Sequence, residues 1–263
     1  MTIRELIAKY QSMGLEERKA ISSTAQKIII DAIASSELKD RILLKGGIVM
    51  FNLTKNIRRA TMDIDFDIIH YDLSRDSIER LISKLDEASP DYSISIIDGP
   101  FPLHQEDYKG VRIYLKIRDY SWSIKTKVDI GVHTLFGIEQ KAMAFTFLDS
   151  EECVVLKVNP IEQIAAEKIY SLFKHEILSK RYKDISDIYY LINEEDFNKE
   201  TFVKCLEYFT IGKKITIDDI VDSVISIIED KNYQEKVRQS KSLWTKEKQK
   251  TIIMSIVSFL ESI

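Results

Sequence analysis

Apolar and polar residues follow two different patterns along the chain, and the change between them lies at Pro160. Before Pro160, short alternating or apolar segments predict strands, with amphipathic helices between them. The predicted strands cover 42–44, 63–69, 92–96, 110–117, 123–130, 142–148 and 153–158, and the predicted helices cover 15–38, 48–53 and 74–88. After Pro160, apolar residues recur every three or four positions, which is typical of helices. These helices are predicted at 161–178, 182–193, 199–209, 217–231 and 246–262.

The pattern predicts an α+β (α/β) fold with two parts. We expect residues 1–159 to form a mixed sheet with flanking helices, and residues 160–263 to form a helical domain. A chain of 263 residues is long enough for two such domains. Its content of 44% hydrophobic residues, with only eight Gly and four Pro, excludes collagen-like and low-complexity sequence.

The charge balance limits how the protein could bind nucleic acid. The 38 basic and 42 acidic side chains give a formal net charge of −4, so the chain is not a polycation. Any contact with nucleic acid must therefore come from a local basic patch. Cys153 and Cys205 lie about fifty residues apart and predict free thiols rather than a disulfide framework. Because no apolar run has the length of a signal peptide or a membrane span, we expect a cytoplasmic protein without a membrane segment.

Three carboxylates share one face of the predicted strand 63–69. Asp63, Asp65 and Asp67 alternate with apolar residues, which occupy the opposite face. Two unpaired carboxylates about 4–7 Å apart repel by roughly 2–4 kcal/mol at an effective dielectric constant near 20. A solvated strand face tolerates this repulsion, and a cleft that collects a divalent cation relieves it. Both interpretations are open at this point, and Asp67 is expected to support the other two.

The setting of the acidic strand favours the metal site. Gly46 and Gly47 lie between a predicted strand and a predicted helix, about sixteen residues upstream, where backbone amides can hold phosphate groups. Asp129, near the end of strand 123–130, would join Asp63 and Asp65 if the two strands are neighbours. Two carboxylates for Mg²⁺ and a third that orients or deprotonates a hydroxyl group suit metal-assisted nucleotidyl transfer.

Charged side chains in the second half allow two interpretations each. Lys168 lies within an otherwise apolar helix stripe, so it either reaches solvent or an acid, or binds an anion such as a triphosphate. Asp184 and Asp187 are about one helical turn apart, where acids also suit a helix N-terminus. The basic stretches 174–183 and 236–250, the second around Trp244, are either solvated helix faces or contacts for an RNA acceptor.

Five short blocks together resemble the AbiEii/AbiGii toxin family of nucleotidyltransferases, which belongs to the DNA polymerase beta-like superfamily. The likeness covers roughly residues 40–195. The blocks are Lys45-Gly46-Gly47, Arg59-x-Thr61-x-Asp63-Ile64-Asp65-Phe66, Lys127-Val128-Asp129-Ile130, Glu167-Lys168 and Arg181-x-Lys183-Asp184-Ile185-x-Asp187-Ile188. Each block alone is weak, and their order and combination make the set specific. Gly47 stands where the superfamily has Ser, a replacement usual for this family.

The resemblance implies roles for single residues. It implies a Mg²⁺ or Mn²⁺ site on Asp63 and Asp65 with Asp129 as the third acid. It implies that the residues required for activity include these three and two in the helical half, Lys168 and Asp184. The residues expected to contact the nucleotide are Lys45, Gly46, Gly47, Arg59, Thr61 and Lys168. The helical domain, residues 160–263, would then complete the active site of the nucleotidyltransferase domain, residues 1–159. Whether Arg59, Thr61, Arg181 and Asp187 contact the substrate or only support the fold is left open.

The resemblance also implies a biological role. We expect transfer of a nucleoside monophosphate from a nucleoside triphosphate to an acceptor, RNA such as tRNA, by the toxin of a bacterial toxin–antitoxin pair used in phage defence. A cognate antitoxin would be its partner. Two alternatives remain: the same chemistry on a small molecule, or a catalytically silent module that binds a nucleotide or a partner.

Overall fold

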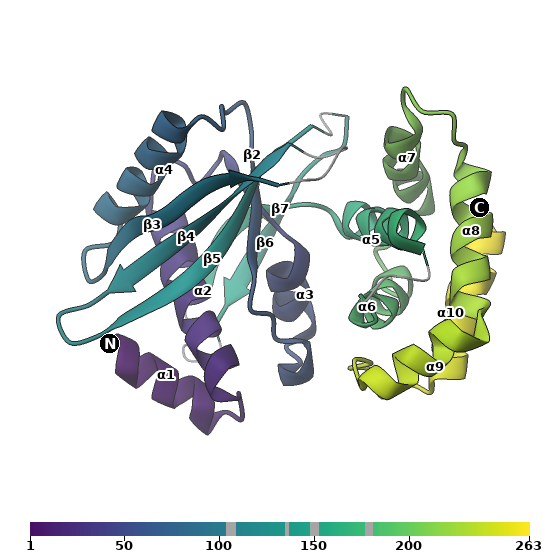
Figure 1. The fold of residues 1–263 in the computed structure, drawn as a ribbon, viewed down its shortest axis with the longest axis horizontal. Coiled ribbons are helices and arrows are strands. Elements are labelled where there is room, and N and C mark those ends of the chain that lie inside the picture. Colours follow the sequence, from purple (N-terminus) through teal and green to yellow (C-terminus); the bar gives the residue numbers. More distant parts are fainter. Residues whose placement is uncertain (104–108, 135–136, 148–152, 177–180) are drawn as a thin grey trace. The chain divides into compact units, whose positions relative to one another are not determined.

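Seven strands form one mixed sheet in the part of the chain that precedes Pro160 (Figure 1). A computed structural model describes residues 1–103, 109–134, 137–147, 153–176 and 181–263. The strands are β1 (Ile42–Lys45), β2 (Ile64–Ile68), β3 (Ser93–Pro102), β4 (Gly110–Arg118), β5 (Ser123–Val132), β6 (Lys141–Thr146) and β7 (Cys153–Val158). Their order across the sheet is β3-β4-β5-β2-β1-β7-β6. Each corresponds to a strand predicted from the sequence.

The sheet is mixed because two pairs of neighbouring strands are parallel. These pairs are β2 with β5 and β1 with β7, and the remaining neighbours are antiparallel. The parallel pairing of β2 and β5 places the two acidic strands side by side at the centre of the sheet. The predicted mixed sheet with flanking helices is therefore confirmed.

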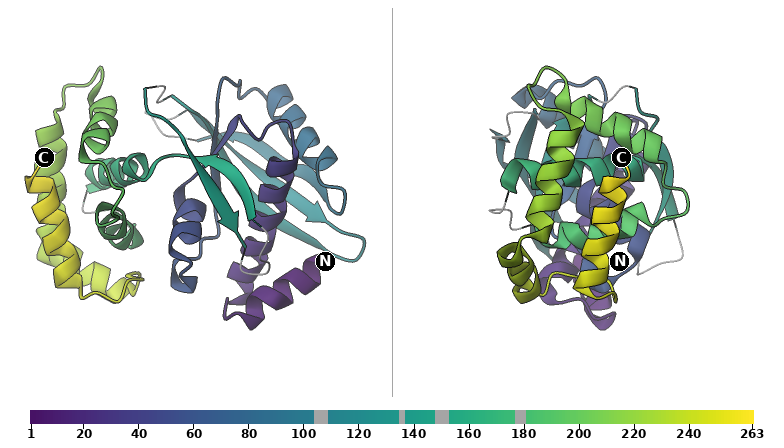
Figure 2. Two further views of the ribbon diagram at one scale, coloured as in Figure 1. Left: turned by 180° about the vertical axis from the view of Figure 1, so that it is seen from behind. Right: turned by 90° about the vertical axis from the view of Figure 1, so that its right-hand side faces the viewer.

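Among the described residues, four α-helices accompany the sheet. They are α1 (Ile3–Ser12), α2 (Glu17–Ser35), α3 (Gly46–Thr54) and α4 (Arg75–Glu87), with one 3₁₀ turn, η1 (Ile57–Arg59). Helix α2 packs on β5 and β7, and α4 packs on β3 and on α2. Seen from behind, α2 passes in front of the strands (Figure 2). The apolar face of β2, with Ile64, Phe66 and Ile68, is buried in this core, so its acidic face points away from it.

Helix α1 is absent from the sequence prediction, although the chain contains a start signal for it. Thr2 and Glu5 form a reciprocal capping box at its N-terminus. Ile3, Leu6 and Tyr10, at three- and four-residue spacing, are its buried residues. The Ile3 amide also donates to Asp119 at the β4–β5 turn, 2.6 Å away. This contact, distant in sequence, fixes the start of α1 against the sheet.

The segment after Pro160 consists of helices in the residues described. They are α5 (Ile161–His175), α6 (Lys183–Ile192), α7 (Lys199–Thr210), α8 (Ile217–Glu229), α9 (Lys231–Ser240) and α10 (Gln249–Glu261). Five of them were predicted, and α9 was not, because only Tyr233 and Val237 on it are buried. The predicted end of the first helix, 177–178, lies outside the described residues.

The chain divides into two compact units. We call Met1–Phe136 with Gln140–Asn159 the sheet unit, and Gly137–Glu139 with Pro160–Ile263 the helical unit. Among the described helices, none is long and apolar enough to cross a membrane.

Candidate nucleotidyltransfer site

A glycine turn joins β1 to α3 and packs directly on the acidic strand. Gly46 has a φ of +67°, and a Cβ atom there would lie 2.7 Å from Asp65 Oδ2. A Cβ atom on Gly47 would lie 2.5 Å from Thr61 Oγ1. These distances are too short for a side chain, so both positions require glycine. The strand, glycine turn and helix expected from the sequence are all present, and they bring the backbone against Asp65 and Thr61.

Four charged residues lie in one row across four neighbouring strands. Lys45 is opposite Asp65, Asp65 is opposite Asp129, and Asp129 is opposite Arg112. Residues in register on neighbouring strands project from the same face of a sheet. We call this set the charged row. It puts two carboxylates side by side, with a basic residue on the strand beyond each of them.

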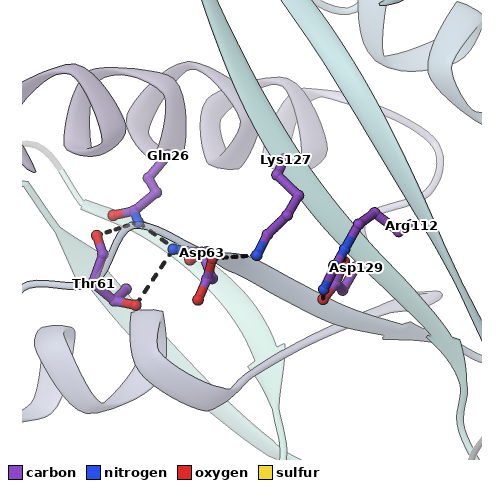
Figure 3. Close-up of polar contacts among 6 residues, drawn as sticks. All are labelled: Gln26, Thr61, Asp63, Arg112, Lys127 and Asp129. Atoms are coloured by element: carbon purple, nitrogen blue, oxygen red, sulfur yellow. Dashed lines mark hydrogen bonds and ion pairs between the residues drawn. The ribbon is translucent and has the colours of Figure 1, made fainter. Parts of the chain in front are cut away.

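Arg112 holds Asp129 with both arms of its guanidinium group (Figure 3). Nε lies 2.8 Å from Oδ1, and Nη2 lies 2.8 Å from Oδ2. The hydrogen bonds to Asp129 raise the pKa of Arg112. Bidentate pairing of this kind fixes the plane of a carboxylate as well as its position. Asp129 is therefore oriented by its cross-strand neighbour.

Asp63 is held at the beginning of β2 by side chains from two other elements (Figure 3). Lys127 on β5 lies with its Nζ 2.7 Å from Asp63 Oδ1. Gln26 on α2 donates through Nε2 to the carbonyl oxygens of Thr61 and Asp63, at 3.0 and 3.3 Å. The Asp63 amide in turn donates to Thr61 Oγ1 at 3.4 Å. The core helix α2 thus fixes the backbone that presents the first acid.

The carboxyl group of Asp65 is less acidic than that of an ordinary aspartate. Burial is the largest cause that raises its pKa, to about 6, and the attraction of Lys45 acts in the opposite direction. The negative charges of Asp63 and Asp129 raise it further. A carboxylate that is both buried and next to like charges is stabilised by any cation that reaches it.

Lys45 and Asp67 form a buried ion pair behind the row. Lys45 Nζ lies 2.6 Å from Asp67 Oδ1, and the two side chains are 13% and 5% exposed. Asp67 is therefore the partner of a lysine, in agreement with its expected supporting place. Lys45 lies between Asp67 and the glycine turn, where it also faces Asp65 across the strands.

The donor set suits a divalent cation by type and by register. Asp63, Asp65 and Asp129 offer hard carboxylate oxygens, and Asp65 and Asp129 are direct neighbours. In the described part of the chain, however, no three acidic, His or Cys side chains are gathered as a metal centre. Lys127 and Arg112 hold two of the three carboxylates in the present arrangement. A cation that binds here therefore has to displace or share these ion pairs.

Thr61 and Arg59, the remaining nucleotide contacts predicted in the sheet unit, are both buried. Thr61 is 4% exposed and packs on Gly47, and Arg59 in η1 is 2% exposed. Both therefore belong to the packed segment that leads into β2. Whether either side chain contacts the nucleotide stays a prediction.

In the helical unit, Lys168 on α5 lies between two aspartates of α6. Its Nζ is 2.7 Å from Asp184 Oδ1 and 2.8 Å from Asp187 Oδ2; both aspartates are buried, and the lysine side chain is 11% exposed. Trp244 donates through Nε1 to Asp187 Oδ1 at 2.8 Å. The apolar stripe thus contains an acid-paired lysine. Trp244 is only 5% exposed, so its ring is not available at the surface of this unit for stacking on an RNA base.

Sequence reasoning gave no role to three residues of the site, Gln26, Arg112 and Lys127, and named only Lys127, as part of a family block. Lys127 could have been found, because it lies two residues before Asp129 and shares its strand face. Gln26 and Arg112 carry no motif. Their role depends on strand register and on helix packing, which the sequence pattern does not specify.

A family model decides the identity of the chain. The model for the nucleotidyl transferase AbiEii toxin of type IV toxin–antitoxin systems matches residues 28–252. This chain belongs to the AbiEii family. The match includes every site residue predicted above. Membership makes this AbiEii chain a nucleotidyltransferase enzyme of a toxin–antitoxin system, with a nucleoside triphosphate as substrate and an antitoxin as partner.

A solved structure has a fold similar to that of this chain. JHP933 from Helicobacter pylori is 16% identical, with a TM-score of 0.53 over 95% of this chain and 93% of that chain. A second H. pylori protein, a proposed nucleotidyltransferase, is 16% identical with a TM-score of 0.49 over 94% of this chain and 95% of its own. The first likeness shows a shared fold. No curated protein sequence matches this chain.

Proposed function

We propose that this AbiEii-family enzyme transfers a nucleoside monophosphate from a nucleoside triphosphate to a hydroxyl group of RNA, such as the 3′ end of tRNA. The observation that carries the proposal is the pairing of Asp65 with Asp129 on parallel strands, directly beside the Gly46 turn. Phosphate groups and carboxylates repel each other, so a site that brings them together is suited to a divalent cation between them. Nucleotidyl transfer needs such a cation together with a group that accepts the proton of the attacking hydroxyl.

The glycine turn and its neighbours would hold the triphosphate. Gly46 and Gly47 offer backbone amides at the start of α3, and Lys45 adds a positive charge at the end of β1. Asp63, Asp65 and Asp129 would hold Mg²⁺ or Mn²⁺. When bound, that cation would neutralise phosphate oxygens and lower the cost of bringing a hydroxyl group to them. Arg59 and Thr61 would support this cradle from within the packed segment.

The reaction itself is a displacement at the α-phosphorus atom. The acceptor oxygen forms a bond to this phosphorus, the bond to the oxygen that bridges the α- and β-phosphates breaks, and pyrophosphate leaves with the electron pair. The hydroxyl proton passes to a carboxylate oxygen of Asp129 and then to solvent. Arg112 would keep that carboxylate in a fixed plane during the transfer.

We further propose that the helical unit completes the active site through Lys168 and Asp184. Their support is the family block that contains them and the buried network in which both lie. The lysine would stabilise negative charge on the triphosphate. Asp184 and Asp187 would set its position, since both contact its ammonium group.

The biological setting completes the proposal. We propose that the enzyme acts in the cytoplasm as the toxin of a phage-defence pair and that a cognate antitoxin neutralises it. Its two cysteines, Cys153 and Cys205, are free thiols, which suits a reducing compartment.

One labelling experiment tests the chemistry. The protein is incubated with Mg²⁺, total cellular RNA and each of four α-labelled nucleoside triphosphates in turn. We expect label on RNA, and a loss of at least about 100-fold in Asp63→Ala/Asp65→Ala. The double variant Asp40→Ala/Asp91→Ala, which removes two exposed carboxylates of the same unit, should retain activity. Label only on a small molecule, or nucleotide binding without any transfer, would contradict the RNA acceptor.

A further inference from the structure

The face of the sheet that carries the catalytic carboxylates continues as a basic and aromatic surface along β4 and β5. Strand register defines it. On β4 it consists of Arg112, Tyr114, Lys116 and Arg118, and on β5 of Ser123, Lys125, Lys127 and Asp129. We call it the carboxylate face. The intervening residues of β4, from Val111 to Ile117, are buried in the core on the other side.

Two lysines oppose each other directly on this face. Lys116 and Lys125 are register partners on antiparallel strands. Like charges in this position destabilise a sheet unless an anion lies between or above them. Among the residues that the structure describes, neither side chain has a hydrogen bond or an ion pair, and Arg118 has none either. The neighbouring basic residues Arg112 and Lys127 differ from these three because each forms an ion pair, Arg112 with Asp129 and Lys127 with Asp63.

Aromatic side chains lie among these basic residues. Tyr114 is 37% exposed and lies opposite Lys127, one row from the charged row. Phe101 on β3 is 45% exposed and contacts Tyr114 edge-on, with ring centroids 6.4 Å apart. Exposed rings between positive charges are the combination that holds unpaired nucleic-acid bases and their backbone. One carboxylate, Asp98, accompanies them on β3.

From Arg112 to Arg118 the surface extends over seven residues of β4, or about 20 Å. This length suits several nucleotides and is more than the triphosphate at the glycine turn requires. The surface ends at the β4–β5 turn, which lies beside α1 (Figure 1). A docked protein would need a buried apolar centre, and this face offers charges with two half-exposed rings instead.

We propose that the carboxylate face binds the single-stranded end of the RNA acceptor, with Lys116, Arg118 and Lys125 on its phosphates and Tyr114 on a base. This inference rests on the proposed function and adds the direction from which the RNA approaches the charged row. The RNA runs along β4 and β5 toward the charged row and delivers its terminal hydroxyl group there.

The direct test is fluorescence anisotropy with a labelled 12-nucleotide single-stranded RNA, titrated at several salt concentrations. Lys116→Gln/Lys125→Gln should bind it on the order of 10-fold more weakly. Its log–log salt slope should be smaller by about 1.4, from about 0.7 per lost phosphate contact. Tyr114→Leu should also bind about 10-fold more weakly, with an unchanged slope, because it removes stacking and no charge. The matched control is Lys19→Gln/Lys39→Gln, which removes two charges of the sheet unit outside this face.

Two further measurements separate this inference from the proposed function. Binding of a fluorescent nucleoside triphosphate should be the same in the wild type and in Lys116→Gln/Lys125→Gln, which would also show that the variant is folded. If the wild type labels RNA and the double variant labels it with the same KM, the RNA path is wrong and the activity stands. If polyglutamate competes with the RNA at equal charge concentration, the face is an acidic-protein surface and the proposal is overturned.

Discussion

Asp65 and Asp129 lie directly opposite each other on the parallel strands β2 and β5. In the sequence, 64 positions separate residue 65 from residue 129. The pairing places two carboxylates side by side, and burial raises the pKa of Asp65 to about 6. This arrangement costs stability when both groups are ionised, and a cation compensates for it. The same carboxylate pair that suits a cation therefore lowers the stability of the sheet when no cation is bound.

Asp65→Asn should stabilise the metal-free protein at neutral pH. The folded-state pKa of Asp65 is raised, so its favourable contribution is complete below about pH 4 and is lost as the pH rises through about 6. An asparagine side chain does not ionise, so the variant does not lose stability as the pH rises through about 6. Its free energy of unfolding should exceed that of the wild type by on the order of 1–3 kcal/mol at pH 7 in EDTA, with no difference of this sign at pH 4. Urea unfolding at both pH values measures it, and equal curves at pH 7 would contradict the assignment.

Gly46→Ala should be more damaging than an alanine at another glycine with the same backbone conformation. The added Cβ atom would lie 2.7 Å from Asp65 Oδ2, so Asp65 or the turn must move. Gly212→Ala is the matched control, since Gly212 has a φ of +72° and no atom within 4 Å of the new Cβ. Both variants should lose about 1–2 kcal/mol from backbone strain. Only Gly46→Ala should also lose nucleotide affinity, and equal affinity in the two variants would separate the turn from the nucleotide site.

Lys168→Met should destabilise the helical unit. It leaves Asp184 and Asp187 as neighbouring buried carboxylates without their shared ammonium group. Removing one member of a buried ion pair costs roughly 3–5 kcal/mol. Lys214→Met, at an exposed position of the same unit, should change the unfolding free energy by less than about 0.5 kcal/mol. Thermal unfolding compares the two, and an unchanged melting temperature with lost nucleotide binding would mean that Lys168 serves the triphosphate alone.

Asp119→Asn should loosen α1 from the sheet. Burial opposes ionisation of Asp119, but hydrogen bonds from the amides of Ile3, Ser121 and Trp122 outweigh it and lower its pKa. Its stabilising contribution is therefore present above the ordinary Asp pKa and is lost as the pH falls through the lowered value. The variant should lose about 1.5–3 kcal/mol at pH 7. Hydrogen exchange of the α1 amides should increase in Asp119→Asn, and unchanged protection would show that α1 is held by its apolar residues alone.

Periodicity alone located most elements of this protein. The alternation of Asp63, Asp65 and Asp67 with Ile64, Phe66 and Ile68 determines a strand with one buried face, because each step along a strand reverses the side-chain direction. The glycine pair between a strand and a helix likewise follows from the sequence. Helix α9 was not predicted from the sequence, because a helix with two buried residues leaves almost no periodic signal.

The sequence therefore determined the acidic strand, the face of that strand on which its carboxylates lie, and the family to which the chain belongs. Only the tertiary structure decided which charges neutralise one another. Arg112 meets Asp129, and Lys168 meets Asp187 and, through it, Trp244, because strand register and helix packing bring together residues far apart in the chain. The opposed Lys116 and Lys125 emerged in the same way. Pairing depends on distances in space, and a one-dimensional pattern of polarity does not contain them.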